Sequence, residues 1–327
     1  MTMPARSWLA SAATPSLSTG RLRQWLRHHA CTSDGRVWSW TNPHHPGFAY
    51  PEAAGLWLAA MAELAPAPAD AVVARLGPNV RDGEVGRDGR AYAFDLAVAL
   101  AGLLHARAAG RAVDASWIEG GRDALASAVA SRRACTPDAP VRWSTRWGPH
   151  LLKIAFALDA LELPDALARL LDDALEAHER GRFVTDADGS TYVHAHCYAT
   201  EGLWFLATHA DRSLAALART RLRPALDWLA EVQGSDGALP ASYDGAPAGP
   251  GRTDATAQAI RLWAVTDPAR FGGAIERGLQ FLSRHCGPDG GLAYDTTNDD
   301  QTTWSAVFAL QALQLVTAAP GTTRVLW

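Results

Sequence analysis

An internal repeat of about 50 residues constrains the fold of this sequence more than any other feature. Residues 225–239 align with residues 278–292 without a gap, and both contain an aromatic-Leu pair followed by Gly-x-Asp-Gly. Residues 24–35 follow the same plan with one inserted residue. Repeats of this length are typical of stacked architectures. The pattern predicts six units, which are anchored at Asp34, Asp88, Asp138, Asp188, Asp236 and Asp289.

Each unit is predicted to be a helix, a turn and a second helix. In the first helices, apolar residues recur every three or four positions, as in a helix with one buried face. These helices are expected at 17–30, 69–76, 116–131, 166–180, 214–232 and 269–285. The second helices are apolar on every side, as interior helices are. They are expected at 52–64, 92–106, 148–161, 196–207, 254–265 and 302–316. An Asp-Gly turn should end each first helix, because glycine can adopt a left-handed conformation.

Six outer and six inner helices predict an all-α fold, a closed (α/α)6 toroid of six helical hairpins of about 50 residues each. One hairpin cannot bury both of its faces, so neighbouring hairpins must stack. Residues 17–318 would form this single domain, between a flexible N-terminus at 1–16 and a C-terminal tail at 319–327. Closure would bring the six Asp-Gly loops to one rim, around the N-terminal ends of the inner helices.

Charge and composition exclude several classes of protein. The formal net charge of −4 argues against a nucleic-acid-binding surface. No run of ~18 apolar residues is present, so no membrane span is expected. Residues 1–20 lack the apolar run of a cleaved secretory signal. The four cysteines form no Cys-x-x-Cys pair, which argues against a zinc ribbon or a disulfide framework. We therefore expect a cytoplasmic protein, and its oligomeric state is left open.

The chemistry is expected at the starts of the inner helices, where polar and aromatic residues recur. Aromatic faces there could stack on a small molecule or an oligosaccharide, and acids could bind its polar groups. The predicted catalytic residues are Asp95, Glu201, His196, Asp254 and Asp300. The predicted substrate-binding residues are Trp38, Trp40, Tyr50, Glu52, Tyr92, Arg146, Trp147, His194, Tyr198 and Trp304.

The acidic candidates also have structural interpretations. Asp254 and Glu52 lie in first helical turns, where a carboxylate can cap the backbone and interact with the helix dipole. Asp95 and Glu201 lie among apolar residues, and a buried carboxylate needs a partner. That partner could be a substrate or an inner arginine in a salt bridge.

The segment His194-Ala-His196-Cys197 contains residue types that bind zinc. Adjacent helical residues point about 100° apart, however, and no second pair of ligands stands elsewhere in the sequence. We therefore expect no metal and no cofactor. His196 is instead predicted to act as a general acid or base, because the pKa of histidine lies near neutral pH. Packing in the core is the alternative for this side chain.

Two resemblances support the toroid. The repeated helix, Asp-Gly turn and helix resembles terpenoid cyclases and protein prenyltransferases, but the Asp-x-Asp-Asp motif of class II cyclases is missing. Tyr50-Pro51-Glu52-Ala-Ala-Gly55 resembles a segment of (α/α)6 proteins from bacterial polysaccharide biosynthesis. Phe94-Asp95, the fourth inner helix and Leu239-Pro240 follow in the order of that group, which is similar to six-hairpin glycosidases, lyases and epimerases.

Three functions stay open at this point. The first is an enzyme acting on a sugar or glycan, as a hydrolase, lyase or epimerase, with Asp95 and Glu201 as the acid and base. The second is terpenoid or other polycyclic cyclisation, with Asp254 or Asp300 as proton donor. The third is a non-catalytic binding scaffold, since concave repeat surfaces often bind partners. An open, wet cavity with paired acids would favour the glycan, and a closed apolar cavity would favour cyclisation.

Overall fold

The computed structural model describes residues 17–41, 46–138 and 142–318. Its α-helices are α1 (Thr19–His28), α2 (Pro51–Met61), α3 (Pro66–Arg81), α4 (Ala93–Ala108), α5 (Ala115–Ala130), α6 (Ala155–Ala160), α7 (Pro164–Glu176), α8 (Val193–His209), α9 (Arg212–Val232), α10 (Thr253–Thr266), α11 (Gly272–Arg284) and α12 (Thr303–Thr317). The 3-10 helices are η1 (Trp143–Thr145) and η2 (Pro149–Ile154). The strands are β1 (Trp40–Thr41), β2 (Gly86–Arg87), β3 (Arg90–Tyr92), β4 (Cys135–Thr136), β5 (His178–Glu179), β6 (Arg182–Phe183), β7 (Thr191–Tyr192), β8 (Leu239–Tyr243), β9 (Pro247–Arg252) and β10 (Gln301–Thr302). The predicted flexible N-terminus and C-terminal tail lie outside the described residues.

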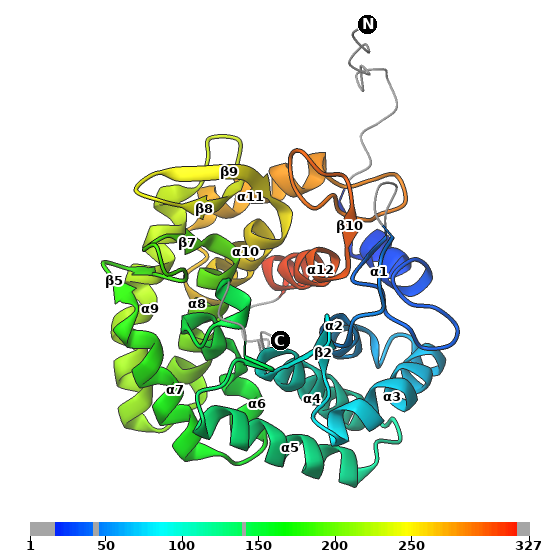
Figure 1. Ribbon diagram of the computed structural model, residues 1–327. Coiled ribbons are helices and arrows are strands. Elements are labelled where there is room, and N and C mark those ends of the chain that lie inside the picture. Colours follow the sequence, from blue (N-terminus) through cyan, green and yellow to red (C-terminus); the bar gives the residue numbers. More distant parts are fainter. Residues whose placement is uncertain (1–16, 42–45, 139–141, 319–327) are drawn as a thin grey trace, which may run out of the picture.

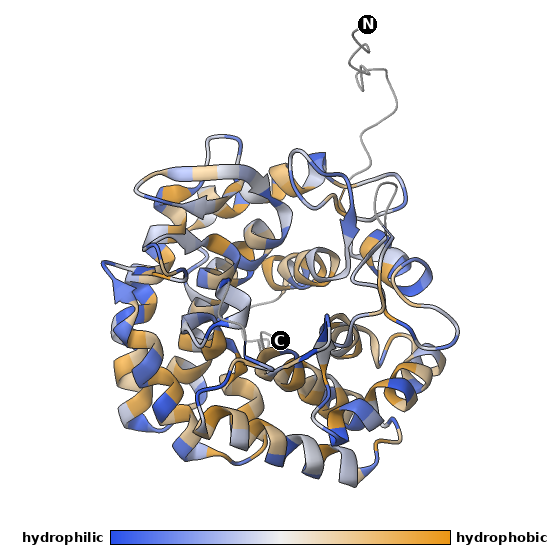
Figure 2. Cartoon of the chain, viewed as in Figure 1, coloured by the Kyte–Doolittle hydropathy of each residue, from blue (hydrophilic) through white to orange (hydrophobic). Residues whose placement is uncertain are grey.

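The helices form two concentric rings (Figure 1). The inner ring consists of α2, α4, η2 with α6, α8, α10 and α12, and the outer ring of α1, α3, α5, α7, α9 and α11. Inner helices are buried on nearly all sides, and every residue of α10 from Thr253 to Ala264 is buried. Outer helices bury one face, as α7 does through Leu167, Leu170, Leu171 and Ala174. Figure 2 shows the inner helices as largely apolar and the outer helices as striped. The predicted all-α (α/α)6 toroid is confirmed.

Contacts between the first and the last hairpin close the ring. Strand β1 pairs with β10 in an antiparallel arrangement. Trp25 Nε1 donates to Gln301 Oε1 over 2.8 Å, and Arg21 Nη2 donates to the carbonyl of Gly287 over 3.2 Å. Closure directs the N-terminal ends of all the inner helices to the same end of the molecule.

That end also carries the long connections. All ten strands of the described residues lie in connections that lead from an outer helix to an inner helix. The connections that lead back to an outer helix are short, and only Ala210 and Asp211 separate α8 from α9. We call the end with the strands the mouth and the opposite end the far end. No helix within the described residues is both long and apolar enough to cross a lipid bilayer.

Glycines let the turns after the outer helices lie against the next outer helix. A Cβ on Gly237 would lie 2.1 Å from the carbonyl oxygen of Arg277 in α11. A Cβ on Gly35 would lie 2.3 Å from a backbone oxygen of α3, and one on Gly290 would lie 2.7 Å from a backbone oxygen of α1. All three glycines have positive φ angles. The Asp-Gly pairs of the first, fifth and sixth units are therefore equivalent, as the repeat predicts.

The anchors of the other three units are not equivalent. In the fourth unit, Gly181 takes this place, because its Cβ would lie 2.5 Å from a backbone oxygen of α9, whereas Gly189 has open space around it. In the second unit, Gly83 lies two residues after the end of α3 and has a φ of 70°, ahead of the predicted Asp88. In the third unit, Arg132 adopts a positive φ after α5.

The third inner helix also departs from the prediction. The segment 148–161 was expected to be one α-helix, but it begins as the 3-10 helix η2 and continues as α6. Pro149 occupies the first turn of η2, where a missing N–H does not disrupt the helix. The second outer helix is longer than the predicted 69–76, because α3 begins at Pro66, and proline is well suited to a first helical position.

Replacement of Gly237 by alanine should destabilise the protein more than replacement of Gly189. The φ angles are 91° and 87°, so alanine strains the backbone at both positions, at a cost of about 1–2 kcal/mol each. Only at Gly237 does the new Cβ also meet the Arg277 carbonyl, which adds about 1–3 kcal/mol. Urea denaturation of Gly237→Ala and Gly189→Ala measures both losses. Equal losses would mean that the turn does not pack on α11.

Candidate active site

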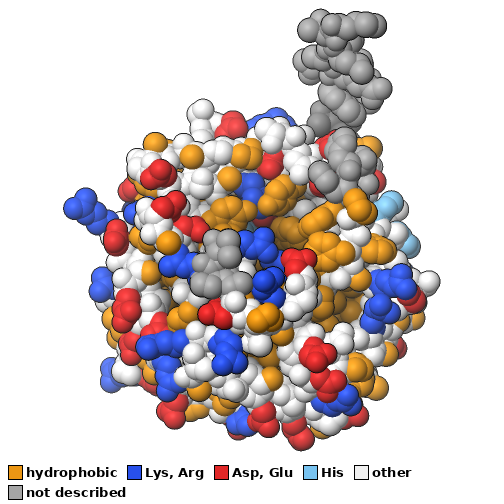
Figure 3. All heavy atoms as spheres, in the orientation of Figure 1, with side chains coloured by type: hydrophobic (Ala, Val, Ile, Leu, Met, Phe, Trp, Pro, Cys, Tyr) orange, Lys and Arg blue, Asp and Glu red, His pale blue; other side chains and the backbone are white. Residues whose placement is uncertain are grey.

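A cavity of about 450 Å³ opens at the mouth, within the ring of inner-helix N-termini. Figure 3 looks into this hollow, around which apolar and basic side chains gather. Side chains from all six hairpins line it, because closure brings the starts of the inner helices together. Half of the lining residues are aromatic, namely Trp40, Phe48, Tyr50, Tyr92, Phe94, Trp143, Tyr192, Tyr198, Tyr294 and Trp304.

The cavity brings together nine of the predicted site residues. They lie at the start of an inner helix or in the segment just before it, as expected. They are Trp40, Tyr50, Glu52, Tyr92, Asp95, His194, Tyr198, Asp254 and Trp304.

Glu52 and Asp95 form the acidic side of this cavity. Burial raises the pKa of both carboxyl groups, and the neighbouring charge of Glu52 holds the pKa of Asp95 well above its ordinary value. The Arg87 guanidinium opposes both shifts without cancelling them. Tyr50 hydrogen-bonds to Asp95, and the Tyr198 hydroxyl donates to Glu52 Oε1 over 3.4 Å. Asp95 lines the cavity, and its Oδ2 atom has no hydrogen-bond partner among the described residues. Asp95 therefore holds its proton more tightly than an ordinary aspartic acid.

Asp254 lies in the wall formed by the start of α10, and its environment is the opposite of that around Asp95. Arg252 Nε donates to Asp254 Oδ1 over 3.1 Å, and Arg252 also binds Oδ2. Trp304 Nε1 donates to Oδ2 over 3.2 Å, and His194 Nδ1 lies 3.4 Å from the same oxygen. Burial alone would raise the pKa of Asp254, but Arg252 and His194 outweigh burial and lower it. Asp254 is ionised and holds the wall together, which corrects its expected role as a proton donor.

Glu201 does not line the cavity. Lys153 Nζ lies 2.7 Å from its Oε2, while Arg261 and Gln258 bind its Oε1, the latter over 3.1 Å. Burial would raise the pKa of Glu201, but the two cations lower it. The structure thus corrects the expected acid/base pair: Glu201 is a partner in a buried salt bridge, and Asp95 is paired with another acid.

His196 faces away from the cavity. The Phe183 N–H donates to its Nδ1 over 3.2 Å, Nε2 lies 3.3 Å from the Ala225 carbonyl, and its ring packs on Trp228 with centroids 4.4 Å apart. Burial lowers its pKa to about 3. The predicted acid/base role is therefore replaced by the packing alternative. His194 turns to the cavity instead, and no three His, Cys, Asp or Glu side chains of the described residues are grouped as metal ligands.

Four more predicted residues lie outside the cavity. Arg146 and Trp147 line a separate groove of about 510 Å³, where Trp147 Nε1 donates to Asp173 over 2.9 Å. Trp38 lies in the connection before α2, and Asp300 lies in the loop before β10. Their positions correct the expected binding and catalytic roles, which required side chains in one shared pocket.

Eleven lining residues are missing from the predicted site. Some of them, such as Tyr192 directly before α8, lie at the start of an inner helix, where the sequence pattern predicts the site. These residues could have been found from the sequence. Others, such as Arg87 in β2 and Tyr294 after α11, come from loops whose path the sequence does not define. The full set is Phe48, Arg87, Asp88, Phe94, Arg142, Trp143, Ser144, His150, Tyr192, Arg252 and Tyr294.

His150 is the most informative of these residues. It is 1% exposed, and its Nε2 has no hydrogen-bond partner among the described residues. Burial lowers its pKa to about 3, so the imidazole is neutral. Its ring stands edge-on to Trp143 with centroids 5.2 Å apart. A buried polar atom without a partner in the lining of a cavity can form a hydrogen bond with a bound ligand.

The cavity therefore combines two kinds of carboxyl group. Burial and the adjacent Glu52 raise the pKa of Asp95, whereas Arg252 and His194 lower the pKa of Asp254. Titratable groups whose environments push their pKa values apart in one site are suited to acid/base chemistry. The aromatic lining adds flat surfaces for stacking or for stabilising positive charge.

The comparisons with known proteins bear on the fold. No family model and no curated protein matches this chain. An unsaturated glucuronyl hydrolase specific for heparin has 14% identity and a TM-score of 0.66, over 91% of this chain and 95% of its own. A polysaccharide lyase has 15% identity and a TM-score of 0.64, over 92% and 98%. The type II terpene cyclase MstE from Scytonema has 16% identity and a TM-score of 0.58, over 91% and 95%.

These similarities are at the level of the fold. The chain shares the (α/α)6 toroid of carbohydrate-active enzymes and of a terpene cyclase. At such low identities the shared fold does not specify a reaction, because one fold hosts many chemistries.

Replacement of Glu201 by glutamine should destabilise the protein strongly. The variant leaves Lys153 and Arg261 buried without a counter-charge, at a cost of about 3–5 kcal/mol. Denaturant unfolding at neutral pH measures the loss. Glu231→Gln, at an exposed position, is the control and should leave stability unchanged. A Glu201→Gln protein as stable as the control would contradict the salt-bridge assignment.

Proposed function

We propose that this protein is an enzyme that acts on a sugar or glycan, with Asp95 as its general acid. The observation that carries this proposal is the pair of carboxyl groups, Glu52 and Asp95, in an aromatic cavity that opens at the mouth. The reaction class is hydrolysis, elimination or epimerisation. All four cysteines are free thiols, which supports a reducing compartment such as the cytoplasm.

The state of Asp95 supports the role of proton donor. A general acid must carry its proton at the working pH, which requires a raised pKa in a carboxyl group. Burial and the charge of Glu52 provide that shift. In hydrolysis, Asp95 would give its proton to the glycosidic oxygen as the C–O bond breaks, and water would supply the new hydroxyl group. The second proton of that water would return to the Asp95–Glu52 pair, which restores the acid for the next turnover.

The lining supports a polyhydroxylated ligand. Trp143 and Tyr192 stack with centroids 5.2 Å apart, and their rings form one aromatic part of the lining. His150 Nε2 and Asp95 Oδ2 have no partners among the described residues, so hydroxyl groups of a bound sugar can satisfy them. An apolar ligand would leave both atoms unsatisfied, at a cost of about 1–3 kcal/mol each.

The Asp95→Asn variant tests the proposal. It should lower kcat/KM by about 10²–10⁴-fold, because an amide cannot donate the proton. Since asparagine has nearly the same shape as aspartic acid, the fold should be kept. Activity would be measured on unsaturated uronide disaccharides and on a panel of aryl glycosides. Ultraviolet absorbance and sugar release would report turnover. Glu231→Gln, with its exposed side chain, is the matched control. Full activity in Asp95→Asn would remove the assignment.

The pH profile provides a separate check. Because the pKa of Asp95 is raised, its proton is lost at a higher pH than that of an ordinary aspartic acid. Activity should therefore fall on the alkaline side of the profile. Since ionisation is unfavourable in the folded state, the stability of the wild type should also fall as pH rises through that pKa, and Asp95→Asn should lack this fall. A flat alkaline profile for activity would contradict the role.

Cyclisation of a polyprenyl substrate is the second candidate. Half of the cavity lining is aromatic, and aromatic faces stabilise the positive charge that develops in such reactions. A protonated Asp95 would serve here as well, and would replace Asp254 and Asp300 of the earlier hypothesis. This function would be selected if the wild type converted a geranylgeranyl arene but none of the glycosides. The Asp95→Asn variant should then lose that conversion. Binding of either class without turnover would select the non-catalytic scaffold.

A further inference from the structure

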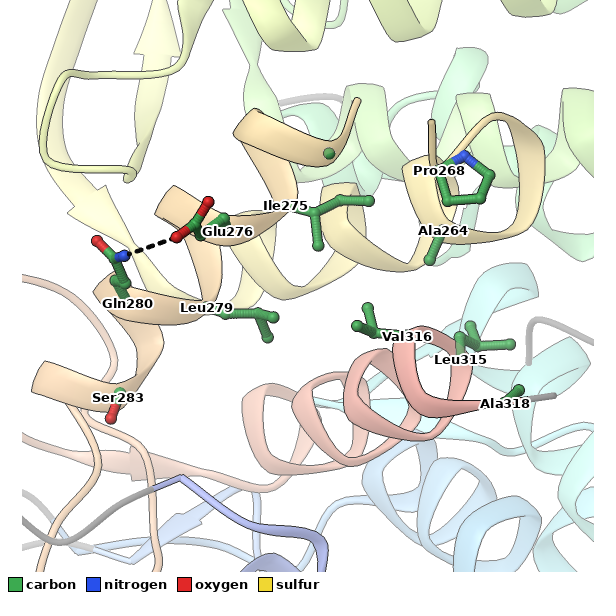
Figure 4. A pocket seen from close by; sticks show the side chains of 11 residues that line it. Ala264, Pro268, Ile275, Glu276, Leu279, Gln280, Ser283, Leu315, Val316 and Ala318 are labelled. Atoms are coloured by element: carbon green, nitrogen blue, oxygen red, sulfur yellow. Dashed lines mark hydrogen bonds between the residues drawn. The ribbon is translucent and has the colours of Figure 1, made fainter. Parts of the chain in front are cut away.

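A second hollow, remote from the mouth cavity, lies along α11. It is a groove of about 640 Å³ that begins at the far end, beside the last turns of α10 and α12 (Figure 4). Its walls are apolar, with Ile275 and Leu279 from α11 facing Leu315 and Val316 from α12. Val316 is 39% exposed, which is unusual for a large apolar side chain in this molecule. The groove shares no residue with the candidate active site.

The short first helix explains why this groove is open. Around the ring, α11 is followed by α1, on which the Gly290 turn rests. Helix α1 has 10 residues and is the shortest outer helix of the described residues, since α7 and α11 have 13 each and α3 and α5 have 16 each. All outer helices end at the mouth, so the turns that α1 lacks are missing from the far end. Within the described residues, no side chain of α1 lines the groove, and apolar surface of α11 and α12 stays open there.

We propose that residues 319–327 of this chain occupy the groove. Ala318, the last described residue before this segment, is itself part of the groove lining (Figure 4). Pro320-Gly321 follows two residues later, and this dipeptide is typical of a tight turn. Helix α12 runs from the mouth to the far end, so a reversal after it sends the chain back along α11.

Length and composition fit the same path. The groove follows α11 from Gly272 to Ser283, which is about 16 Å of helix at 1.5 Å per residue. Residues 322–327 span about 20 Å when extended. Three of these six residues are apolar, Val325, Leu326 and Trp327, and they match the apolar walls.

Charge fits as well. Glu276 lies in the groove lining on α11 and is exposed, and its carboxylate accepts a hydrogen bond from Gln280 Nε2 over 3.5 Å. Arg324 supplies the opposite charge within residues 322–327. The pair would orient the segment, although an exposed ion pair adds only about 0.2–1 kcal/mol.

Disulfide trapping in the full chain tests the path. Ser283→Cys combined with Leu326→Cys should form an intramolecular disulfide under mild oxidation, and mass spectrometry should detect the linked peptides. Thr220→Cys on α9 combined with Leu326→Cys is the control and should stay reduced, and the four native cysteines are buried. Equal trapping at both sites would overturn the proposal. Disulfide-linked dimers would overturn it too and assign the groove to a second copy.

Thermal unfolding provides the second measurement. Deletion of residues 319–327 should lower Tm by about 2–4 °C, and Leu279→Asp should lower Tm in the full chain but add little in the deleted chain. Glu276→Arg should slow disulfide trapping, and adding Arg324→Glu should restore its rate. Independent, additive Tm losses for deletion and Leu279→Asp would overturn the proposal, because groups in contact are coupled.

Discussion

Closure of the inner ring is the constraint on which the rest of this structure depends. The inner helices are apolar on nearly every side, so each needs neighbours on both flanks, and only a closed ring provides them for the first and last hairpins. The pairing of β1 with β10 and the Trp25–Gln301 hydrogen bond complete that ring. Once it is closed, all the inner helices begin at one end, and their first turns surround a shared cavity.

The depth of a charge within the ring decides what that charge does. Glu201 lies eight residues after the start of α8, about 12 Å below the mouth at 1.5 Å per residue, and two cations neutralise it there. Asp95 lies two residues after the start of α4, beside Glu52 and the open cavity. The first arrangement stabilises a buried ion pair. The second raises the pKa of a carboxyl group that a ligand can reach, which is why chemistry is proposed at the mouth.

Helical geometry explains which site residues the sequence could predict. His194 and Tyr198 are four residues apart, share one face of α8 and both line the cavity. His196, midway between them, faces α9 and packs on Trp228. Periodicity marks a face, but it does not say which face turns to the centre of the ring. Arg146 and Trp147 were misplaced for a related reason, because 3-10 turns interrupt the segment around them.

The sequence by itself determined the two classes of helix, their number and the level at which polar and aromatic residues gather. These follow from local periodicity, since an amphipathic and a uniformly apolar helix require different surroundings. Tertiary structure alone decided which acids meet. Glu52 and Asp95 come from different hairpins, and Glu201 finds Lys153 and Arg261 on two others. Such pairings depend on helix rotation and on packing between units, and neither property is encoded in the spacing of residues along one helix.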